Sequence, residues 1–167
     1  MLHKLLLDTL SSLSIVDDSR SSKVIYVRRV NTHIRNVENE ERIVNTLRTR
    51  YGGSLYIHEA KRSVVKEAKI FHTAKLVIGP HGAGLSNIIF CKKGTAVVEF
   101  PLEPFVNNVF RYLCQALGMQ YCKLRHLTAF YCGTYLASPE ALQELNEVLD
   151  SVAADANSER GARNEQF

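Results

Sequence analysis

Apolar residues are spaced in two ways along this chain: in short continuous runs rich in β-branched residues, and in stripes at helical spacing. The runs predict strands, and the stripes between them predict helices at about 40–50, 63–74 and 107–118, followed by a last helix that opens at Ser138-Pro139. This alternation favours an α/β, Rossmann-like fold with a mostly parallel sheet flanked by helices. The predicted strands are KVIYV (23–27), SLYIHE (54–59), KLVIG (75–79), TAVVEF (95–100) and MQYCKL (119–124).

The two ends of the chain lie outside this alternation. Leucines at helical spacing predict an N-terminal helix within residues 1–20, which is a candidate connector to another domain. Residues 21–155 are then assigned to one Rossmann-like domain. The stretch 156–167 is polar and aperiodic, so we expect a disordered tail there.

Composition narrows the class of protein. The 167 residues suit one domain with a real core, and the net charge of +4 fits a small phosphate-bearing ligand better than nucleic acid. No apolar run is long enough to span a membrane, and the leucine-rich N-terminus is interpreted as an amphipathic helix rather than a signal peptide. The four cysteines form no CxxC pair, which argues against zinc; buried thiols are favoured, and disulfides stay open.

Ligands in parallel sheets bind beyond the carboxyl ends of the strands, so residues that directly follow strands are the candidates. HGAGL, residues 81–85, follows a buried strand and opens a helix. Its glycines allow the backbone to approach a ligand closely, and free N–H groups at a helix start attract phosphate. His81 can donate to a phosphate oxygen or accept a proton. The alternative is a tight strand-to-helix turn whose histidine is satisfied locally, because HGAGL is neither GxGxxG nor a P-loop.

Three arginines and one glutamate extend this candidate site. Arg28 and Arg29 follow the first strand, and Arg35 precedes the next helix. Guanidinium groups suit phosphate oxygens, although a surface arginine is more often solvated or loosely ion-paired. Glu99 ends the fourth strand and could accept hydrogen bonds from ribose hydroxyls; the alternative is an exposed acid paired with a neighbouring lysine.

The stretch VIGPHGAGLSNIIF, followed by GTAVVEF, resembles the central motif of glycosyltransferase family 61. A second motif agrees, in which YVRR precedes an R-x-V-x-N-E stretch starting at Arg35. A third is an aromatic-bearing helix that ends in Leu117-Gly118 and leads to a strand with Tyr121. The resemblance covers about residues 23–124. The family includes plant xylosyl- and arabinosyltransferases and animal lumenal N-acetylglucosaminyltransferases.

The resemblance implies an inverting, nucleotide-sugar-dependent glycosyltransferase with two Rossmann-like domains in the GT-B arrangement. This chain resembles the C-terminal, donor-binding half, with no metal cofactor. Arg28 or Arg29, together with Arg35, would neutralise the diphosphate, and Glu99 would hold the ribose. His81 is also a candidate catalytic base, although that base could come from the other half. The groups that would face the diphosphate are His81 and the amides of Gly82, Ala83, Gly84 and Leu85.

The expected partners follow from the same resemblance. They are a nucleotide-sugar donor, with UDP as the expected nucleotide, a glycan or protein acceptor, and an N-terminal acceptor domain missing here; nucleic acid is not expected. A eukaryotic member would work in the Golgi or endoplasmic reticulum lumen, and a bacterial one could be cytoplasmic. The alternative is a non-catalytic nucleotide- or phosphate-binding module, or an incomplete fragment without transfer activity. A dehydrogenase is disfavoured, since Arg28-Arg29 stands where its glycine fingerprint would be.

Overall fold

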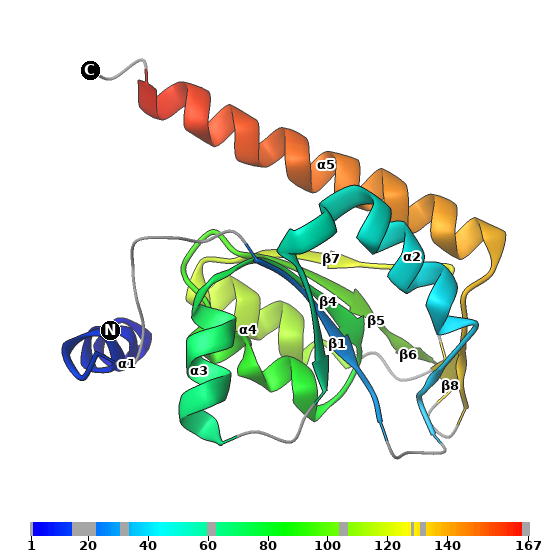
Figure 1. Cartoon of the computed structure of the whole chain (residues 1–167), viewed down its shortest axis with the longest axis horizontal. Coiled ribbons are helices and arrows are strands. Elements are labelled where there is room, and N and C mark those ends of the chain that lie inside the picture. Colours follow the sequence, from blue (N-terminus) through cyan, green and yellow to red (C-terminus); the bar gives the residue numbers. More distant parts are fainter. Residues whose placement is uncertain are drawn as a thin grey trace.

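The computed structural model describes residues 2–14, 23–30, 34–59, 63–103, 107–127, 129–130 and 133–164. At its centre is a five-stranded sheet, parallel throughout, in the order β3-β1-β4-β5-β7 (Figure 1). Helices flank this sheet, so the predicted α/β, Rossmann-like fold is confirmed. All five strands lie where the apolar runs predict them: β1 at Lys23–Arg28, β3 at Leu55–Glu59, β4 at Ala74–Pro80, β5 at Ala96–Phe100 and β7 at Gln120–Lys123.

Helices cover both faces of the sheet. The helices α2 (Glu40–Tyr51) and α5 (Pro139–Asn164) lie on one face, and α3 (Val64–His72) and α4 (Val109–Leu117) lie on the other (Figure 1). A 3₁₀ helix, η2 (Ala83–Phe90), joins α3 and α4 on that second face. The central strands are buried on both sides, which is why their sequences are apolar runs without polar alternation.

The core is divided by the sheet into two clusters, because successive residues of a strand point to opposite faces. Tyr26, Ile78 and Val98 pack beneath α2 and α5. Ile25 and Val97, each next to one of these in the chain, pack beneath α3, α4 and η2 instead. All five side chains are fully buried. The two faces therefore carry different side chains to the strand ends, and this alternation decides which of them reach a site.

Several short elements were not predicted. Two-residue strands form two parallel pairs, and a 3₁₀ turn follows α2; so short an element has no periodicity for a sequence to display. Tyr135, in the second strand of one pair, is fully buried and donates a hydrogen bond of 2.9 Å to the carbonyl of Phe100 at the end of β5. These elements are β2 (Val37–Glu38) with β9 (Tyr135–Leu136), β6 (Leu102–Glu103) with β8 (Ala129–Phe130), and η1 (Gly52–Ser54).

The helices at the two ends differ from expectation in one respect. The N-terminal helix, α1 (Leu2–Ser12), forms as predicted and packs Leu6 and Leu10 against the core cluster beneath α3. The tail prediction was wrong for residues 156–164, because α5 continues to Asn164. Extending a helix is easy once its first turns have formed, and the packed start of α5 supplies them. Residues 165–167 lie outside the described residues. None of the described helices has the length and apolarity that crossing a membrane requires.

Candidate functional site

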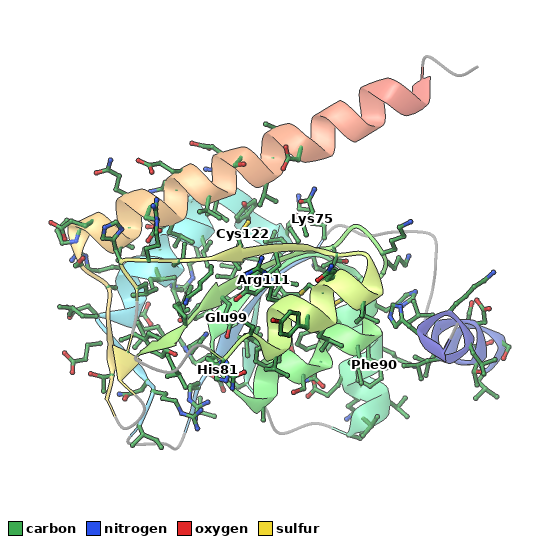
Figure 2. The ribbon with its side chains drawn as sticks, turned by 180° about the vertical axis from the view of Figure 1, so that it is seen from behind. Lys75, His81, Phe90, Glu99, Arg111 and Cys122 are labelled. Atoms are coloured by element: carbon green, nitrogen blue, oxygen red, sulfur yellow. The ribbon has the colours of Figure 1, made fainter. Side chains whose placement is uncertain are left out.

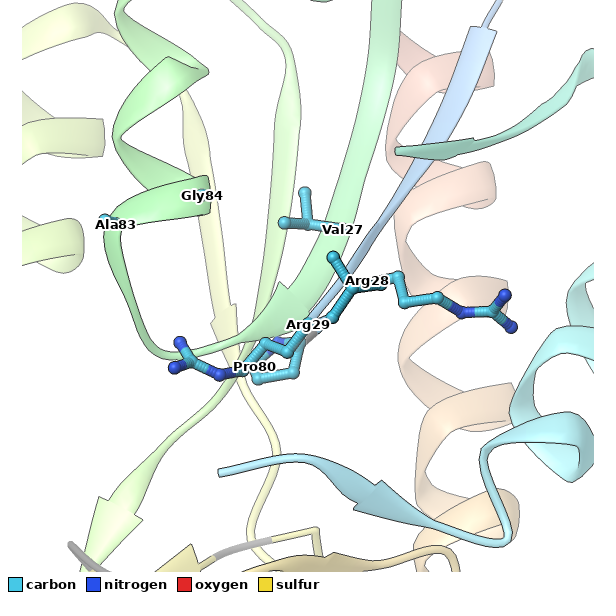
Figure 3. Close-up of a pocket in the computed structure, with 7 residues that line it drawn as sticks. Val27, Arg28, Arg29, Pro80, Ala83 and Gly84 are labelled. Carbon is cyan, nitrogen blue, oxygen red and sulfur yellow. The ribbon is translucent and has the colours of Figure 1, made fainter. Parts of the chain in front are cut away.

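The order of the sheet marks one place where a ligand can bind. Among the five strands of the central sheet, β3 follows β1 in the chain and lies on one side of it, and β4 comes next in the chain and lies on the other side. Connections therefore leave in opposite directions from the carboxyl ends of β1 and β4, and such a switch point opens a crevice. A pocket of about 190 Å³ lies there (Figure 3). It is lined by Val27, Arg28, Arg29, Val30, Pro80, Ala83 and Gly84.

The HGAGL turn forms one wall of this pocket, and two of its glycines are required there. Gly82 has φ 156° and ψ 179°, which other residues rarely adopt, and a Cβ on it would collide with Nη1 of Arg29. A Cβ on Gly84 would lie 2.7 Å from Cγ1 of Val27. The backbone of the turn therefore lies close to Val27 and Arg29, and the predicted close approach to a ligand stays a prediction. Ala83 and Gly84 begin η2, and the first amides of a helix have no partner within that helix.

Leu85 has a structural role in the same turn. Its N–H donates a hydrogen bond of 3.0 Å to the carbonyl of Gly82, and its side chain is fully buried among the residues beneath α3 and α4. The amide of Leu85 is therefore already used and does not face the pocket, contrary to the expectation for it. Of the residues of η2, Ala83 and Gly84 line the pocket.

Arg28 and Arg29 leave β1 in opposite directions (Figure 3). The guanidinium of Arg28 turns toward α2 and pairs with Glu40 at 2.7 Å, Glu41 at 3.2 Å and Glu59 at 3.5 Å. Burial lowers the pKa of Arg28, but these carboxylates outweigh it and raise the pKa above its usual value. Arg28 therefore contributes its backbone to the pocket rim, and its charge is already balanced by acids. The geometry does not favour Arg28 as a diphosphate ligand.

Arg29 turns toward the HGAGL wall instead. Its Nη1 lies against Gly82, and within the described part of the chain its buried Nε has no hydrogen-bond partner. Burial, and then the positive charge of nearby Arg35, lower the pKa of Arg29. Arg35 takes a left-handed conformation, with φ 58°, and its N–H donates to the carbonyl of Gly133 at 2.6 Å. Arg29 lines the pocket, whereas Arg35 does not, although its charge is close enough to act on Arg29. Two neighbouring cations are an arrangement that an anion would stabilise.

Glu99 and His81 form a buried pair beside the pocket (Figure 2). The Nδ1 atom of His81 is hydrogen-bonded to Oε1 of Glu99, and the hydroxyl of Tyr121 donates to Oε2 at 2.5 Å. Glu99 is 1% exposed, so the alternative of an exposed acid paired with a lysine was wrong. Both carboxylate oxygens of Glu99 already accept hydrogen bonds inside the fold. The geometry therefore does not favour Glu99 as a ligand for ribose.

The other side of the His81 ring faces a residue that sequence reasoning missed. Nδ2 of Asn107 lies 3.3 Å from Nε2 of His81, and the ring of Phe110 packs edge-on at 5.2 Å between centroids. Burial, and then the hydrogen bond to Glu99, raise the pKa of Tyr121. Strand alternation could have identified Tyr121, which is paired in register with Val97 on the face that Glu99 shares. Nothing in the sequence distinguishes Asn107 from its neighbours.

Other titratable groups lie away from the pocket. His58 and Glu67 form a second buried pair, with Nε2 and Oε2 2.6 Å apart. Cys91 and Cys114 are buried free thiols, Cys122 is a partly buried free thiol, and Cys132 lies outside the described residues. Among residues that the structure describes, no three His, Cys, Asp or Glu side chains gather as a metal would require.

Comparison with known proteins gives a family match to the part of the chain that forms the pocket. The sequence model of the family Glycosyltransferase 61 matches residues 1–98. That match covers more than half of the chain and includes β1, β4 and HGAGL, which together form the pocket. A search of curated proteins gave no match. The chain therefore belongs to glycosyltransferase family 61.

Proposed function

We propose that this domain binds the diphosphate of a nucleotide-sugar donor, with UDP as the nucleotide, and presents it for inverting transfer to a hydroxyl. One observation carries the proposal. The guanidinium of Arg29 is partly buried beside the glycine turn, and among the residues that the structure describes no carboxylate is ion-paired with it. A cation held in this way, next to the first amides of η2 and at the switch point of a parallel sheet, suits a phosphorylated ligand.

The size of the pocket limits which part of the donor it holds. Its volume of about 190 Å³ is below the roughly 300–1,000 Å³ of pockets that enclose whole small molecules. The diphosphate fits this volume, and the nucleoside and the sugar extend beyond it. The sugar is then selected outside the pocket that Arg29 lines.

The same groups fit the chemistry of transfer. As the bond between the anomeric carbon and the diphosphate breaks, negative charge grows on the departing phosphate oxygen. Arg29 and the amides of Ala83 and Gly84 are donors fixed before the reaction, and fixed donors stabilise developing charge most effectively. They would supply the positive charge that a divalent cation supplies in other transferases, so we propose a metal-independent donor site.

Family membership supports the remaining parts of the proposal. The acceptor is a glycan or protein hydroxyl, presented by a second Rossmann-like domain in the GT-B arrangement. For a eukaryotic protein, we propose the lumen of the endoplasmic reticulum or Golgi as the compartment. α1 is proposed as the connector between the two halves.

Isothermal titration with UDP tests the proposal. Wild type, Arg29→Ala and Arg48→Ala are compared, each with and without EDTA. Arg48 is the matched control, because it is a 57% exposed arginine in the last turn of α2. We expect Arg29→Ala to weaken UDP binding at least about tenfold, Arg48→Ala to leave it unchanged, and EDTA to have no effect. Absence of UDP binding by the folded wild type, or equal binding by Arg29→Ala, would refute the diphosphate site.

A further inference from the structure

His81 is held by hydrogen bonds at both ring nitrogens, and their directions can be read from the partners. On the inner side, Glu99 receives hydrogen bonds from Nδ1 of His81 and from the hydroxyl of Tyr121. A carboxylate only accepts hydrogen bonds, so the proton of this contact lies on Nδ1. The inner contact therefore selects the tautomer of His81 that leaves Nε2 with a free electron pair.

The contact between His81 and Asn107 independently indicates the same tautomer. Oδ1 of Asn107 accepts a hydrogen bond of 3.1 Å from the backbone N–H of Val109, which fixes the orientation of the amide. The amide nitrogen, Nδ2, is then the end that faces Nε2 of His81, at 3.3 Å. An amide nitrogen donates, so Nε2 accepts. Four groups from three parts of the fold thus agree on one protonation pattern.

This pattern separates the two roles that the sequence left open for His81. With the proton on Nδ1, a neutral ring has no N–H at Nε2 to donate to a phosphate oxygen. It can instead accept a proton there. Nε2 is on the side of Asn107, which is itself exposed, whereas Nδ1 faces the buried carboxylate. The 3.3 Å contact is long for a hydrogen bond, so a hydroxyl can replace Asn107 at little cost.

We infer that His81 accepts the proton of the acceptor hydroxyl at Nε2, with Glu99 and Tyr121 as the residues that position it. This inference rests on the proposed donor site. The neighbours of His81 in the chain place it beside that site, because Pro80 lines the pocket and Gly82 contacts Arg29. The acceptor is therefore a hydroxyl compound that approaches from the side of Asn107.

The step balances as follows. The oxygen of the acceptor hydroxyl forms a bond to the anomeric carbon of the sugar. The bond from that carbon to the diphosphate oxygen breaks, and its electron pair leaves with the diphosphate. The hydroxyl proton moves to Nε2, which makes His81 an imidazolium. The negative charge of Glu99 then stabilises that cation across the Nδ1 contact.

The tautomer can be measured in the wild-type chain by NMR. After ¹⁵N labelling of histidine, long-range ¹H–¹⁵N spectra at mildly alkaline pH report which ring nitrogen is protonated. We expect His81 to carry its proton on Nδ1, and its signals are assigned through contacts to the ring of Phe110. His58 is the internal control with the opposite tautomer, because its Nε2 is bonded to Glu67. A His81 protonated on Nε2, or on both nitrogens, would overturn the inference.

A second measurement separates this inference from the proposed function. UDP affinity is compared for wild type, His81→Gln and Arg29→Ala. If His81 serves the hydroxyl, His81→Gln changes UDP affinity less than about threefold, while Arg29→Ala changes it at least about tenfold. Equal losses in both variants would make His81 a diphosphate ligand and overturn the inference. Failure of wild type to bind UDP would refute the donor site, while the tautomer, measured without ligand, still decides which nitrogen of His81 can accept a proton.

Discussion

The hydroxyl of Tyr121 donates a hydrogen bond of 2.5 Å to Oε2 of Glu99 and so joins β7 to β5 on the face that carries His81. The acceptor is a carboxylate that is 1% exposed, and a buried carboxylate depends on its hydrogen bonds. His81 supplies one of these bonds and Tyr121 supplies the other. The stability of the domain and the orientation of His81 are therefore linked through Glu99.

Tyr121→Phe should lower the free energy of unfolding by about 1.5–3 kcal/mol, the contribution of a hydrogen bond to a charged group. Urea denaturation measures this change. Tyr112→Phe is the matched control, since Tyr112 is 63% exposed and its substitution should stay within about 0.5 kcal/mol of wild type. If the two variants are equally stable, the bond from Tyr121 does not support the buried carboxylate.

Gly84→Ala should destabilise the fold by about 1–3 kcal/mol, because the added Cβ would lie 2.7 Å from Cγ1 of Val27. Val27 cannot easily give way, since it is branched at Cβ and almost fully buried. Gly53→Ala is the control: nothing lies within 4 Å of a Cβ there, so the same substitution should be neutral or slightly stabilising. Equal urea midpoints for the two variants would contradict the tight approach of η2 to β1.

Arg29→Ala should not destabilise the ligand-free domain, because burial and the charge of Arg35 already disfavour the cation at this position. Added pyrophosphate should raise the melting temperature of wild type and of Arg48→Ala, and raise that of Arg29→Ala much less. Thermal melts with and without pyrophosphate measure both effects. Arg29 would be structural if Arg29→Ala melted well below wild type without ligand and if pyrophosphate raised the melting temperatures of both proteins equally.

Stability should fall at alkaline pH, partly through Tyr26. Burial, and then the carboxylate of Glu40, raise the pKa of Tyr26 well above its usual value of about 10. As pH rises, the hydroxyl of Tyr26 therefore loses its proton in the unfolded chain before it does so in the folded one. The contribution of Tyr26 to stability is complete below about pH 10 and is lost as pH rises toward the folded pKa. Tyr26→Phe should therefore show a smaller loss of stability than wild type between about pH 9 and pH 11 in urea denaturation. Equal losses of stability in Tyr26→Phe and wild type would contradict the raised pKa of Tyr26.

Much of the fold could be predicted because it depends on local patterns. Continuous apolar runs predict buried strands, and the stripes between them predict the helices that cover the sheet. The position of HGAGL between a buried strand and a helix could be predicted, whereas the close contacts of Gly82 with Arg29 and of Gly84 with Val27 could not. The length of α5 could not be predicted in this way, because polar residues continue a helix whose first turns are held by the core.

The sequence by itself determined the parallel sheet, the strand ends that matter and the residue types at the pocket. Only the tertiary structure decided which of those residues face it. Alternation at the end of β1 sends Arg28 and the next residue, Arg29, to opposite sides, but which side holds the acids of α2 depends on how that helix packs. In the same way, Glu99 meets His81 and Tyr121 only through the register of three neighbouring strands. Apolar patterns along a chain predict which residues are buried, whereas the partners of a side chain depend on contacts between segments that are far apart in the sequence.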